Sequence, residues 1–342
     1  MDVDRSDGRA QVMERSRARN NRGFALLLEG RLGAARQEFE AAVQADASNA
    51  TAYSNLGFVL GRLGEREQAR EALQLALRLD PEAASAATNL GNLAFEERRW
   101  DEAIDHYRTA VRCEPEQVAG WRNLAIAQQE AGRYADALAS HQECLALAPA
   151  DAVAHHNLGL TYEALGRLDE ARREFLAAAS IEPARADSLT NLGMIHFLRQ
   201  ELDQAARWFE AARTANPGAW VASFNLALVL AAQGKTLRAI GELEALHERL
   251  PGSSAITNNL AVLYLAAGLP EQASALLESL LSGSPEDPGL HYNLGVAAHA
   301  SGAADDARAA FSRVLDLEPE DSPRRQDAER WLTRCAEVTG DD

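Results

Sequence analysis

The sequence predicts an all-α solenoid built from nine copies of one helix pair, and three observations predict it. First, an asparagine returns every 34 residues. The positions in this register are Asn55, Asn89, Asn123, Asn157, Asn191, Asn225, Asn259 and Asn293, with Asn21 one step earlier. Second, an alanine keeps its place in every copy, from Ala35 to Ala307. Third, each copy holds two stretches of apolar residues at helical spacing, and a fixed period of this length indicates a repeat array.

One copy, residues 152–185, shows why the pattern predicts two helices. The apolar face of its first half is Leu158, Tyr162 and Leu165. The apolar face of its second half is Leu168, Ala171, Phe175 and Ala178. Gly166 separates the halves, and Pro183 ends the second because proline lacks an N–H and disfavours helix in the residue before it. Neither helix can bury its apolar face alone, so neighbouring copies must stack.

Nine copies in this register cover residues 16–321, which sets the domain organisation. Residues 1–15 are then an N-terminal tail and helix extension, and residues 322–342 are a C-terminal capping helix with an acidic tail. Ser322 can act as N-cap and Pro323 can take the first helical position. One apolar stripe follows, made of Ala328, Trp331, Leu332, Cys335 and Val338. We expect this stripe to cover the last copy; the alternative is a helix that is offered to a partner.

Further markers recur at fixed places in the copies. A Leu-Gly step occurs at Leu56-Gly57, Leu90-Gly91, Leu158-Gly159, Leu192-Gly193 and Leu294-Gly295. The residue four after the constant alanine is Phe39, Tyr107, Phe175, Phe209 or Phe311, with leucine in other copies and His141 in one. Proline closes the later copies, from Pro81 to Pro319. Glycine and alanine let two helix backbones approach closely, and the ring fills the space beside that contact.

These markers resemble the tetratricopeptide repeat family. The resemblance implies a right-handed α-solenoid superhelix of about nine such helix pairs plus the capping helix. Two copies depart from the pattern, because Arg98 and Gln200 stand where most copies have a turn glycine. Those two turns must be closed in another way or carry local strain.

Charge and composition exclude several classes of partner. The formal net charge is −17, from 51 acidic and 34 basic residues, which argues against nonspecific nucleic-acid binding. No window reaches the roughly 20 apolar residues that a spanning helix needs, so we expect no membrane insertion, and no signal peptide is visible. The scattered Cys113, Cys144 and Cys335 fit core thiols in a reducing compartment, and we expect a cytoplasmic protein. Its arginine- and alanine-rich composition suggests a bacterial gene with a high GC content.

The sequence contains no recognisable catalytic motif, so we predict a protein that is not an enzyme. Glycines stand singly at turns and form no phosphate-binding loop, and no Gly-x-Ser-x-Gly follows a strand. The one histidine pair, His155-His156, lacks the nearby carboxylates or thiols of a metal site, which favours satisfied helix histidines. We therefore expect no cofactor and no metal.

The resemblance implies that the first helices line a concave groove, with six lining positions in each copy. The sixth residue of each copy is the recurring asparagine, so the groove would carry an asparagine ladder similar to the one in O-GlcNAc transferase, which holds an extended peptide by its backbone. An amide side chain has two donors and an acceptor, so it can pair with any peptide group. The alternative is that these amides bond only within the array.

The other lining positions differ between the two halves of the chain. Copies one to five offer Arg17, Arg62, Glu96, Arg122, Glu130, His156 and Glu163. From Ser188 onward the lining is uncharged and offers Met194, Phe197, Leu198, Phe224, Leu228, Val262, Leu265, Tyr292 and Val296. An exposed apolar lining of this kind marks a binding surface, unless these side chains pack against neighbouring helices.

These features predict a scaffold that binds an extended segment of a protein or peptide partner. The asparagines from Asn55 to Asn293 would hold the backbone, and six of the apolar residues would select side chains, namely Met194, Phe197, Phe224, Leu228, Leu265 and Tyr292. A clamp for a C-terminal carboxylate, common in the family, is disfavoured because only Arg122 is basic at the matching positions. Two alternatives stay open: a self-associating building block that forms a homo-oligomer, or the targeting subunit of a separate enzyme.

Overall fold

The computed structural model describes the backbone of residues 2–339 and the side chains of residues 9–335. This part of the chain forms nineteen α-helices and no strand. It divides into two compact units, one ending at Ile181 and one beginning at Glu182, which we call the N-terminal unit and the C-terminal unit. The prediction of an all-α repeat array is confirmed.

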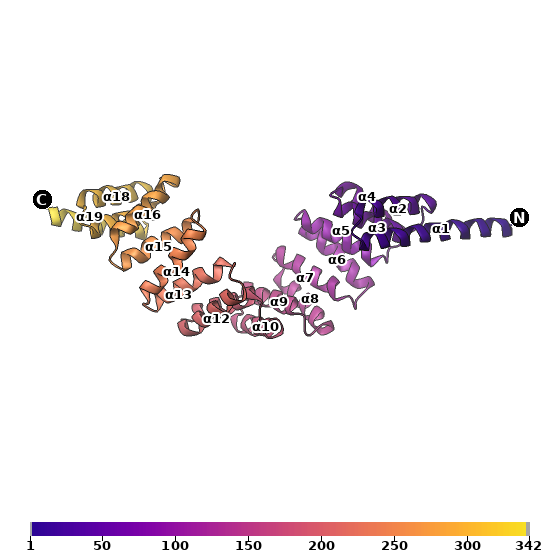
Figure 1. Ribbon diagram of the computed structural model, residues 1–342, viewed down its shortest axis with the longest axis horizontal. Helices are drawn as coiled ribbons and strands as arrows, with labels where there is room; N and C mark the ends of the chain where they lie inside the picture. The colour runs from indigo at the N-terminus through magenta and orange to yellow at the C-terminus, as the bar shows by residue number, and fades with distance from the viewer. Residues whose placement is uncertain (1, 340–342) are drawn as a thin grey trace. The chain divides into compact units, whose positions relative to one another are not determined.

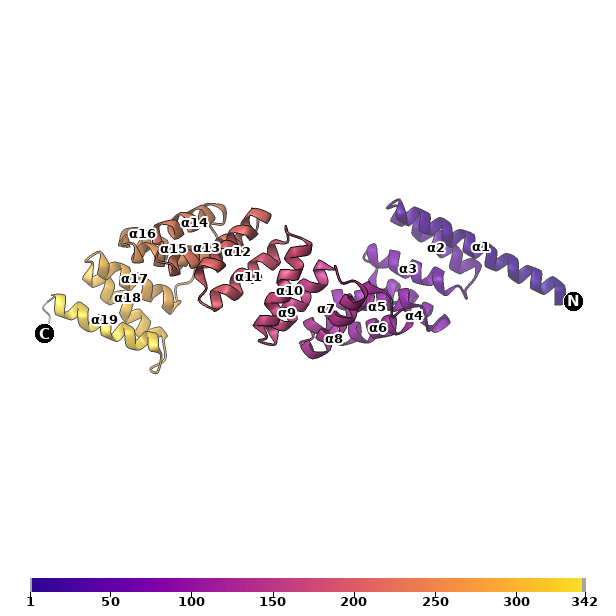
Figure 2. The same ribbon diagram turned by 90° about the horizontal axis from the view of Figure 1, so that it is seen from below.

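The N-terminal unit contains ten helices: α1 (Asp2–Leu28), α2 (Leu32–Ala45), α3 (Ala50–Arg62), α4 (Arg66–Leu79), α5 (Ala84–Glu96), α6 (Trp100–Cys113), α7 (Val118–Glu130), α8 (Tyr134–Leu147), α9 (Ala152–Ala164) and α10 (Leu168–Ile181). The C-terminal unit contains nine: α11 (Ala186–Leu198), α12 (Leu202–Ala215), α13 (Trp220–Ala232), α14 (Thr236–Arg249), α15 (Ser254–Ala266), α16 (Pro270–Gly283), α17 (Pro288–Ala300), α18 (Ala304–Leu317) and α19 (Pro323–Thr339). Within each unit, every helix packs against the next one along the chain (Figures 1 and 2). The odd-numbered helices α1–α17 are the predicted first helices.

The N-terminal extension differs from the prediction at its start. We predicted a tail followed by a helix extension, but α1 is already helical at Asp2. Met1 lies outside the described residues.

The contact inside each helix pair explains the constant small residues. A Cβ atom added at Gly91, Gly159, Gly193 or Gly295 would lie 2.6–2.7 Å from the ring sixteen residues later. The rings are Tyr107, Phe175, Phe209 and Phe311, and each is buried. Three copies instead have alanine in this place, and sixteen residues later they carry no benzene ring but His141, Leu243 or Leu277. In these three copies the larger first residue is matched by a partner without a benzene ring, although Gly57 is also followed by a leucine, Leu73.

The turns that link first and second helices use the left-handed backbone region. Seven glycines have φ between 72° and 84° there. Arg98 and Gln200 adopt the same conformation, with φ of 59° and 62°. Of the two outcomes that the sequence allowed, local strain is the observed one, since a side chain in this region clashes with its own backbone.

Helix α19 packs against α17 and α18 in the place that the first helix of a further copy would take. Ala328 and Cys335 are buried there, and the ring of Trp331 stacks on Phe311 with 5.8 Å between centroids. The Ser322 hydroxyl is bonded to the Glu318 carboxylate, which together with Arg324 lowers the pKa of Glu318. The side chain of Val338, which we placed in the same stripe, lies outside the described residues.

Candidate functional site

The recurring asparagines all lie in first helices, at the sixth residue of each copy. Most are half-buried; Asn21 is exposed, and Asn225 is only 9% exposed. Because their position in the helix pair is the same, the contacts of their amide groups can be compared directly.

Three of these amides are engaged inside the array. Asn55 donates from Nδ2 to Oδ1 of Asn20 at 2.9 Å, and Asn293 donates to Oδ1 of Asn258 at 3.1 Å. Asn259 donates to the carbonyl of Ala255 in its own helix at 2.8 Å. The alternative that the asparagines bond within the array therefore holds at these three positions.

Of the eight asparagines from Asn55 to Asn293, the other five have no such partner among the described side chains, and neither does the exposed Asn21 of the first copy. Among the residues whose side chains the structure describes, no side-chain hydrogen bond is made by Asn89, Asn123, Asn157, Asn191 or Asn225. A buried or half-buried amide without a partner forfeits hydrogen bonds that water or a ligand can supply. Their donors and acceptors are therefore open to water or to a ligand.

Three hollows follow the first helices of the N-terminal unit. One, between α3 and α5, is lined by Gly57, Phe58, Gly61, Arg62, Asn89, Asn92 and Glu96, among others. A second, between α5 and α7, includes Ser85, Thr88 and Asn89. A third, of about 410 Å³, includes Arg17, Asn21 and Thr51. Asn89 lines two of them, so one unpaired amide faces two adjoining spaces.

Two charged lining residues of the N-terminal unit are paired with a neighbour of opposite charge. Arg122 donates to Asp151 at 2.9 Å, and Glu96 lies 3.7 Å from Arg66. The guanidinium of Arg62 lies 6.0 Å from the ring of Phe58. Burial raises the pKa of the Glu163 carboxyl. The pairing of Arg122 leaves no unpaired cation at the position that a carboxylate clamp would use.

In the C-terminal unit, most of the predicted apolar lining residues are partly buried. Met194, Phe197 and Phe224 pack against the core around Phe209, and Leu265 packs against a core around Leu277. Leu228 is half-buried. For these residues the structure favours packing between helices over a fully exposed lining.

Tyr292 is drawn into the contact with α19. Its ring lies 5.8 Å from that of Phe311, and its hydroxyl accepts a hydrogen bond from Nε1 of Trp331 at 3.2 Å. Its role in this structure is to anchor the terminal helix.

The apolar side chains that are more open lie elsewhere. Leu198 is 57% exposed, Val221 42% and Val262 41%, and Trp220 stands next to Val221 at the start of α13. The sequence analysis named Leu198 and Val262 but passed over Trp220 and Val221. The signal for Val221 was available, since it is the second residue of its copy, which is one of the six lining positions.

The histidine pair is engaged as expected. His155 lies 2.7 Å from Glu174 through Nδ1 and 3.1 Å from the carbonyl of Pro149 through Nε2. His156 packs beside Phe175, with 5.5 Å between ring centroids. Within the described residues, no group of three or more His, Cys, Asp or Glu side chains is arranged to hold a metal ion.

Family comparisons agree with this geometry. A tetratricopeptide repeat model matches residues 55–118, 174–219, 192–255 and 258–322, and a second one matches residues 128–192 and 230–282. A further model, described as a TPR repeat, matches residues 23–64. No curated protein matches the sequence. None of the described helices is long and apolar enough to cross a membrane.

Solved structures with similar folds include the PilF protein of Pseudomonas aeruginosa. It is 21% identical over 62% of this chain and 96% of its own, with a TM-score of 0.54, which shows the shared fold. YrrB, described as a TPR protein with an unusual peptide-binding site, is 26% identical over 54% of this chain and 95% of its own, with a TM-score of 0.49. MamA is 24% identical over 48% of this chain and 96% of its own, with a TM-score of 0.45.

Proposed function

Since this chain belongs to the tetratricopeptide repeat family and is therefore a protein-interaction scaffold, we propose that it holds an extended segment of a partner protein against its first helices, without catalysing a reaction. The observation that carries the proposal is the set of unpaired amides at one repeat position: Asn89, Asn123, Asn157, Asn191 and Asn225. The cytoplasm is the location we propose, because Cys113, Cys144 and Cys335 are free thiols.

The unpaired amides suit the backbone of an extended peptide. Each carries two N–H donors and a carbonyl acceptor, and a peptide group in an extended chain presents the complementary pair. Because the contact is to the main chain, it tolerates many partner sequences.

Side chains of the partner would be selected beside these amides. In the C-terminal unit, Leu198, Val221 and Val262 offer exposed apolar surface around an otherwise uncharged lining. In the N-terminal unit, the hollow at Phe58, Arg62 and Asn89 is mixed in character. We therefore expect apolar partner residues against the first helices of the C-terminal unit and polar ones against those of the N-terminal unit.

The test compares two kinds of asparagine in the full chain. A random dodecapeptide library displayed on phage is selected on the wild type, and the enriched peptides are measured by fluorescence anisotropy. The triple variant Asn89→Ala, Asn123→Ala, Asn157→Ala removes unpaired amides, and we expect it to weaken binding about tenfold or more, from the loss of hydrogen bonds. Asn55→Ala is the matched control, because that amide is already bonded to Asn20, and should leave affinity within about twofold.

Helicity and molecular mass are measured for each variant, so that unfolding is not mistaken for lost contact. Equal affinity in the wild type and the triple variant would exclude the amides from binding. A large loss of affinity in Asn55→Ala would contradict the assignment of that amide to a contact within the array.

The ends of the array argue in part against the alternative of a self-associating building block, although α1 also exposes the apolar side chains of Phe24 and Leu28, by 48% and 75%. Seven copies have a buried leucine as the seventh residue of the first helix and one a half-buried leucine, whereas the first copy has Arg22 there, exposed and 3.6 Å from Glu38. Stacking another copy on this face would bury a charge, which is costly. At the other end, the apolar stripe of α19 is already turned onto α17 and α18.

A further inference from the structure

The hollow between α3 and α5 has a volume of about 90 Å³, and a residue of α4 forms part of its wall. Its apolar wall consists of Gly57, Phe58, Gly61, Leu73 and Leu93. Leu73 is fully buried and Leu93 is only 7% exposed, so the wall belongs to the core of the array. Asn89 and Asn92 line the same hollow. It is therefore an apolar recess beside one of the unpaired amides.

The repeat pattern explains why this recess occurs in the second copy. In five copies, glycine as the eighth residue is followed by a ring sixteen residues later, but Gly57 is followed by Leu73. Leucine is shorter than a ring and leaves part of that space empty. The twelfth residue of this copy is Gly61, whereas the other eight copies have a side chain there. These two features occur together in no other copy, and both enlarge the space between α3 and α5.

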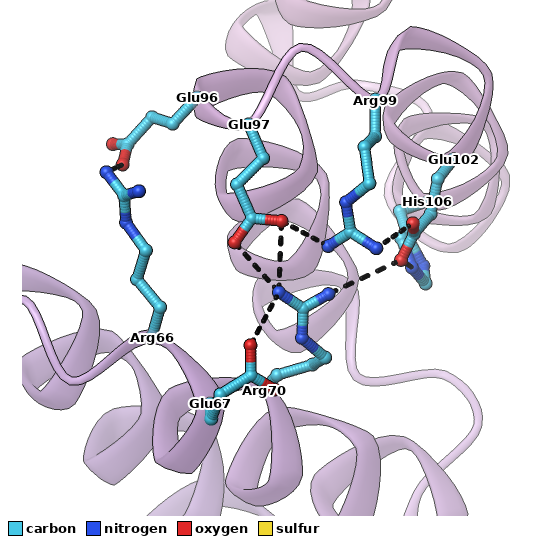
Figure 3. A network of polar contacts seen from close by, with 8 residues as sticks. All are labelled: Arg66, Glu67, Arg70, Glu96, Glu97, Arg99, Glu102 and His106. Atoms are coloured by element: carbon cyan, nitrogen blue, oxygen red, sulfur yellow. Dashed lines mark hydrogen bonds and ion pairs between the residues drawn. The ribbon is translucent and has the colours of Figure 1, made fainter.

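The charged side chains at the edge of the hollow point to other groups. Glu96 is exposed and lies 3.7 Å from Arg66, apart from the ion pairs around Arg70, as Figure 3 shows. Arg62 is exposed as well, and its guanidinium lies 6.0 Å from the ring of Phe58. Neither charge is buried in the recess, so the recess presents apolar atoms to an occupant.

We propose that this hollow receives one branched aliphatic side chain of the partner segment, namely leucine, isoleucine or valine. The inference rests on the proposed function, because the peptide main chain beside Asn89 would position the inserted side chain. Asn89 lines the hollow, and its unpaired amide can pair with the peptide group of the inserted residue. This residue would be the apolar exception among the polar partner residues expected along the N-terminal unit.

The size of the hollow favours an aliphatic side chain over an aromatic one. An apolar cavity that holds a benzene ring has a volume of roughly 150 Å³. The hollow, at about 90 Å³, is smaller. A leucine, isoleucine or valine that enters it would remove apolar surface from water on both sides of the contact.

The test fills the hollow from two directions in the full chain. Leu73→Phe reproduces the pairing of glycine with a ring that five other copies use. Gly61→Leu reproduces the twelfth residue of the eighth copy, Leu265. A Cβ atom at position 61 would lie 3.5 Å from Cδ2 of Leu93, an ordinary contact, so the new side chain starts at the wall of the hollow. Melting temperatures should not fall, because Gly61→Leu also removes a glycine from a helix interior.

Binding is measured by fluorescence anisotropy with peptides enriched on the wild type. One aliphatic residue of these peptides should matter most, and its replacement by alanine should weaken binding about tenfold or more. Its replacement by phenylalanine should also weaken binding. On Leu73→Phe and on Gly61→Leu, the parent and alanine peptides should bind within about twofold of each other. Asn123→Ala, which lies outside the hollow, is the control and should weaken both peptides alike.

An aliphatic residue whose effect stays at full size in both filled variants would overturn the proposal. Enriched peptides without such a residue, or a library without any binding peptide, would overturn it too. The proposed function can fail separately. If the triple asparagine variant keeps the wild-type affinity while Leu73→Phe abolishes the aliphatic preference, the hollow binds and the amides do not. The reverse result would exclude the hollow and retain the amides.

Discussion

At the scale of the residue, two buried or strained positions carry costs that single substitutions can reveal. Gln200 holds a left-handed conformation that seven glycines adopt elsewhere, and His141 occupies a core place where other copies have an aromatic ring or leucine. Both departures are visible in the sequence, but their cost depends on backbone angle and burial, which only the structure supplies.

Gln200→Gly should stabilise the C-terminal unit. The left-handed region costs a non-glycine residue about 1–2 kcal/mol, and Gln200→Gly removes this cost. Part of the gain is lost again, because glycine has more conformational freedom in the unfolded chain. We expect a net gain of about 1 kcal/mol in the free energy of unfolding by urea. Gly268→Ala, in an equivalent turn with φ of 72° and no atom within 4 Å of the added Cβ, is the matched control and should lose a similar amount. A loss of stability in both variants would contradict the strain at Gln200.

His141 should make the N-terminal unit sensitive to acid. Its side chain is fully buried, its Nε2 lies 3.1 Å from Oε1 of Gln129, and burial lowers its pKa from 6.5 to about 4. As the pH falls, His141 therefore takes up its proton at a higher pH in the unfolded chain than in the folded one. The free energy of unfolding falls as the pH drops from about 6.5 toward 4. The full loss is about 3 kcal/mol below pH 4, from the 1.36 kcal/mol that each pKa unit represents.

The measurement compares urea unfolding of the wild type and His141→Leu at several pH values from 7.5 to 4. Leucine is chosen because Ala125 lies sixteen residues before His141, the arrangement that Ala227 and Leu243 already use. We expect the variant to lose less stability between pH 6.5 and pH 4. If the free energies of unfolding of the wild type and of His141→Leu fell in parallel with pH, His141 would have the same pKa in the folded and the unfolded chain.

At the scale of the element, the helix pair is set by two residues sixteen apart. Glycine is followed by a ring in five copies and by Leu73 in one, and alanine is followed by His141, Leu243 or Leu277. A Cβ atom at the glycine would lie inside the contact distance of the ring. A ring therefore requires glycine at the facing position, whereas leucine stands opposite either glycine or alanine.

Exchanging one pair tests this account. Leu243→Phe alone should destabilise the C-terminal unit by about 1–3 kcal/mol through overpacking against the buried Ala227. Adding Ala227→Gly should return most of the loss, because it reproduces the pairing of Gly193 with Phe209. A double-mutant cycle from urea unfolding measures the coupling. Additive losses would show that the two positions act independently.

At the scale of the whole molecule, the first and second helices of each pair present different surfaces. Unpaired asparagine amides and the hollow at Gly61 lie along first helices, whereas Arg70, on the second helix α4, forms an ion pair with Glu97 of the next copy. Arg22 at one end and the packed α19 at the other argue against the stacking of further copies. A partner segment that follows the first helices would contact several copies without a change in fold.

The sequence by itself determined the helix pairs, their number and the terminal helix. A 34-residue period places apolar residues, turn glycine and closing proline at the same points of every copy, and these act locally or between adjacent helices. It also placed the eight asparagines correctly in first helices. The positions of Met194, Phe197 and Phe224 on the array were predicted as well, although their packing against the core was left open.

Only the tertiary structure decided which of those residues are available. Asn55 and Asn293 are engaged because the preceding copy happens to carry Asn20 and Asn258, whereas Asn89 has no such neighbour. The hollow at Gly61 depends on residues contributed by three helices, and no one of them alone indicates it. Whether an amide is unpaired, and how large a hollow is, depends on side chains that come together from different copies. A pattern along the chain does not contain the distances between those side chains.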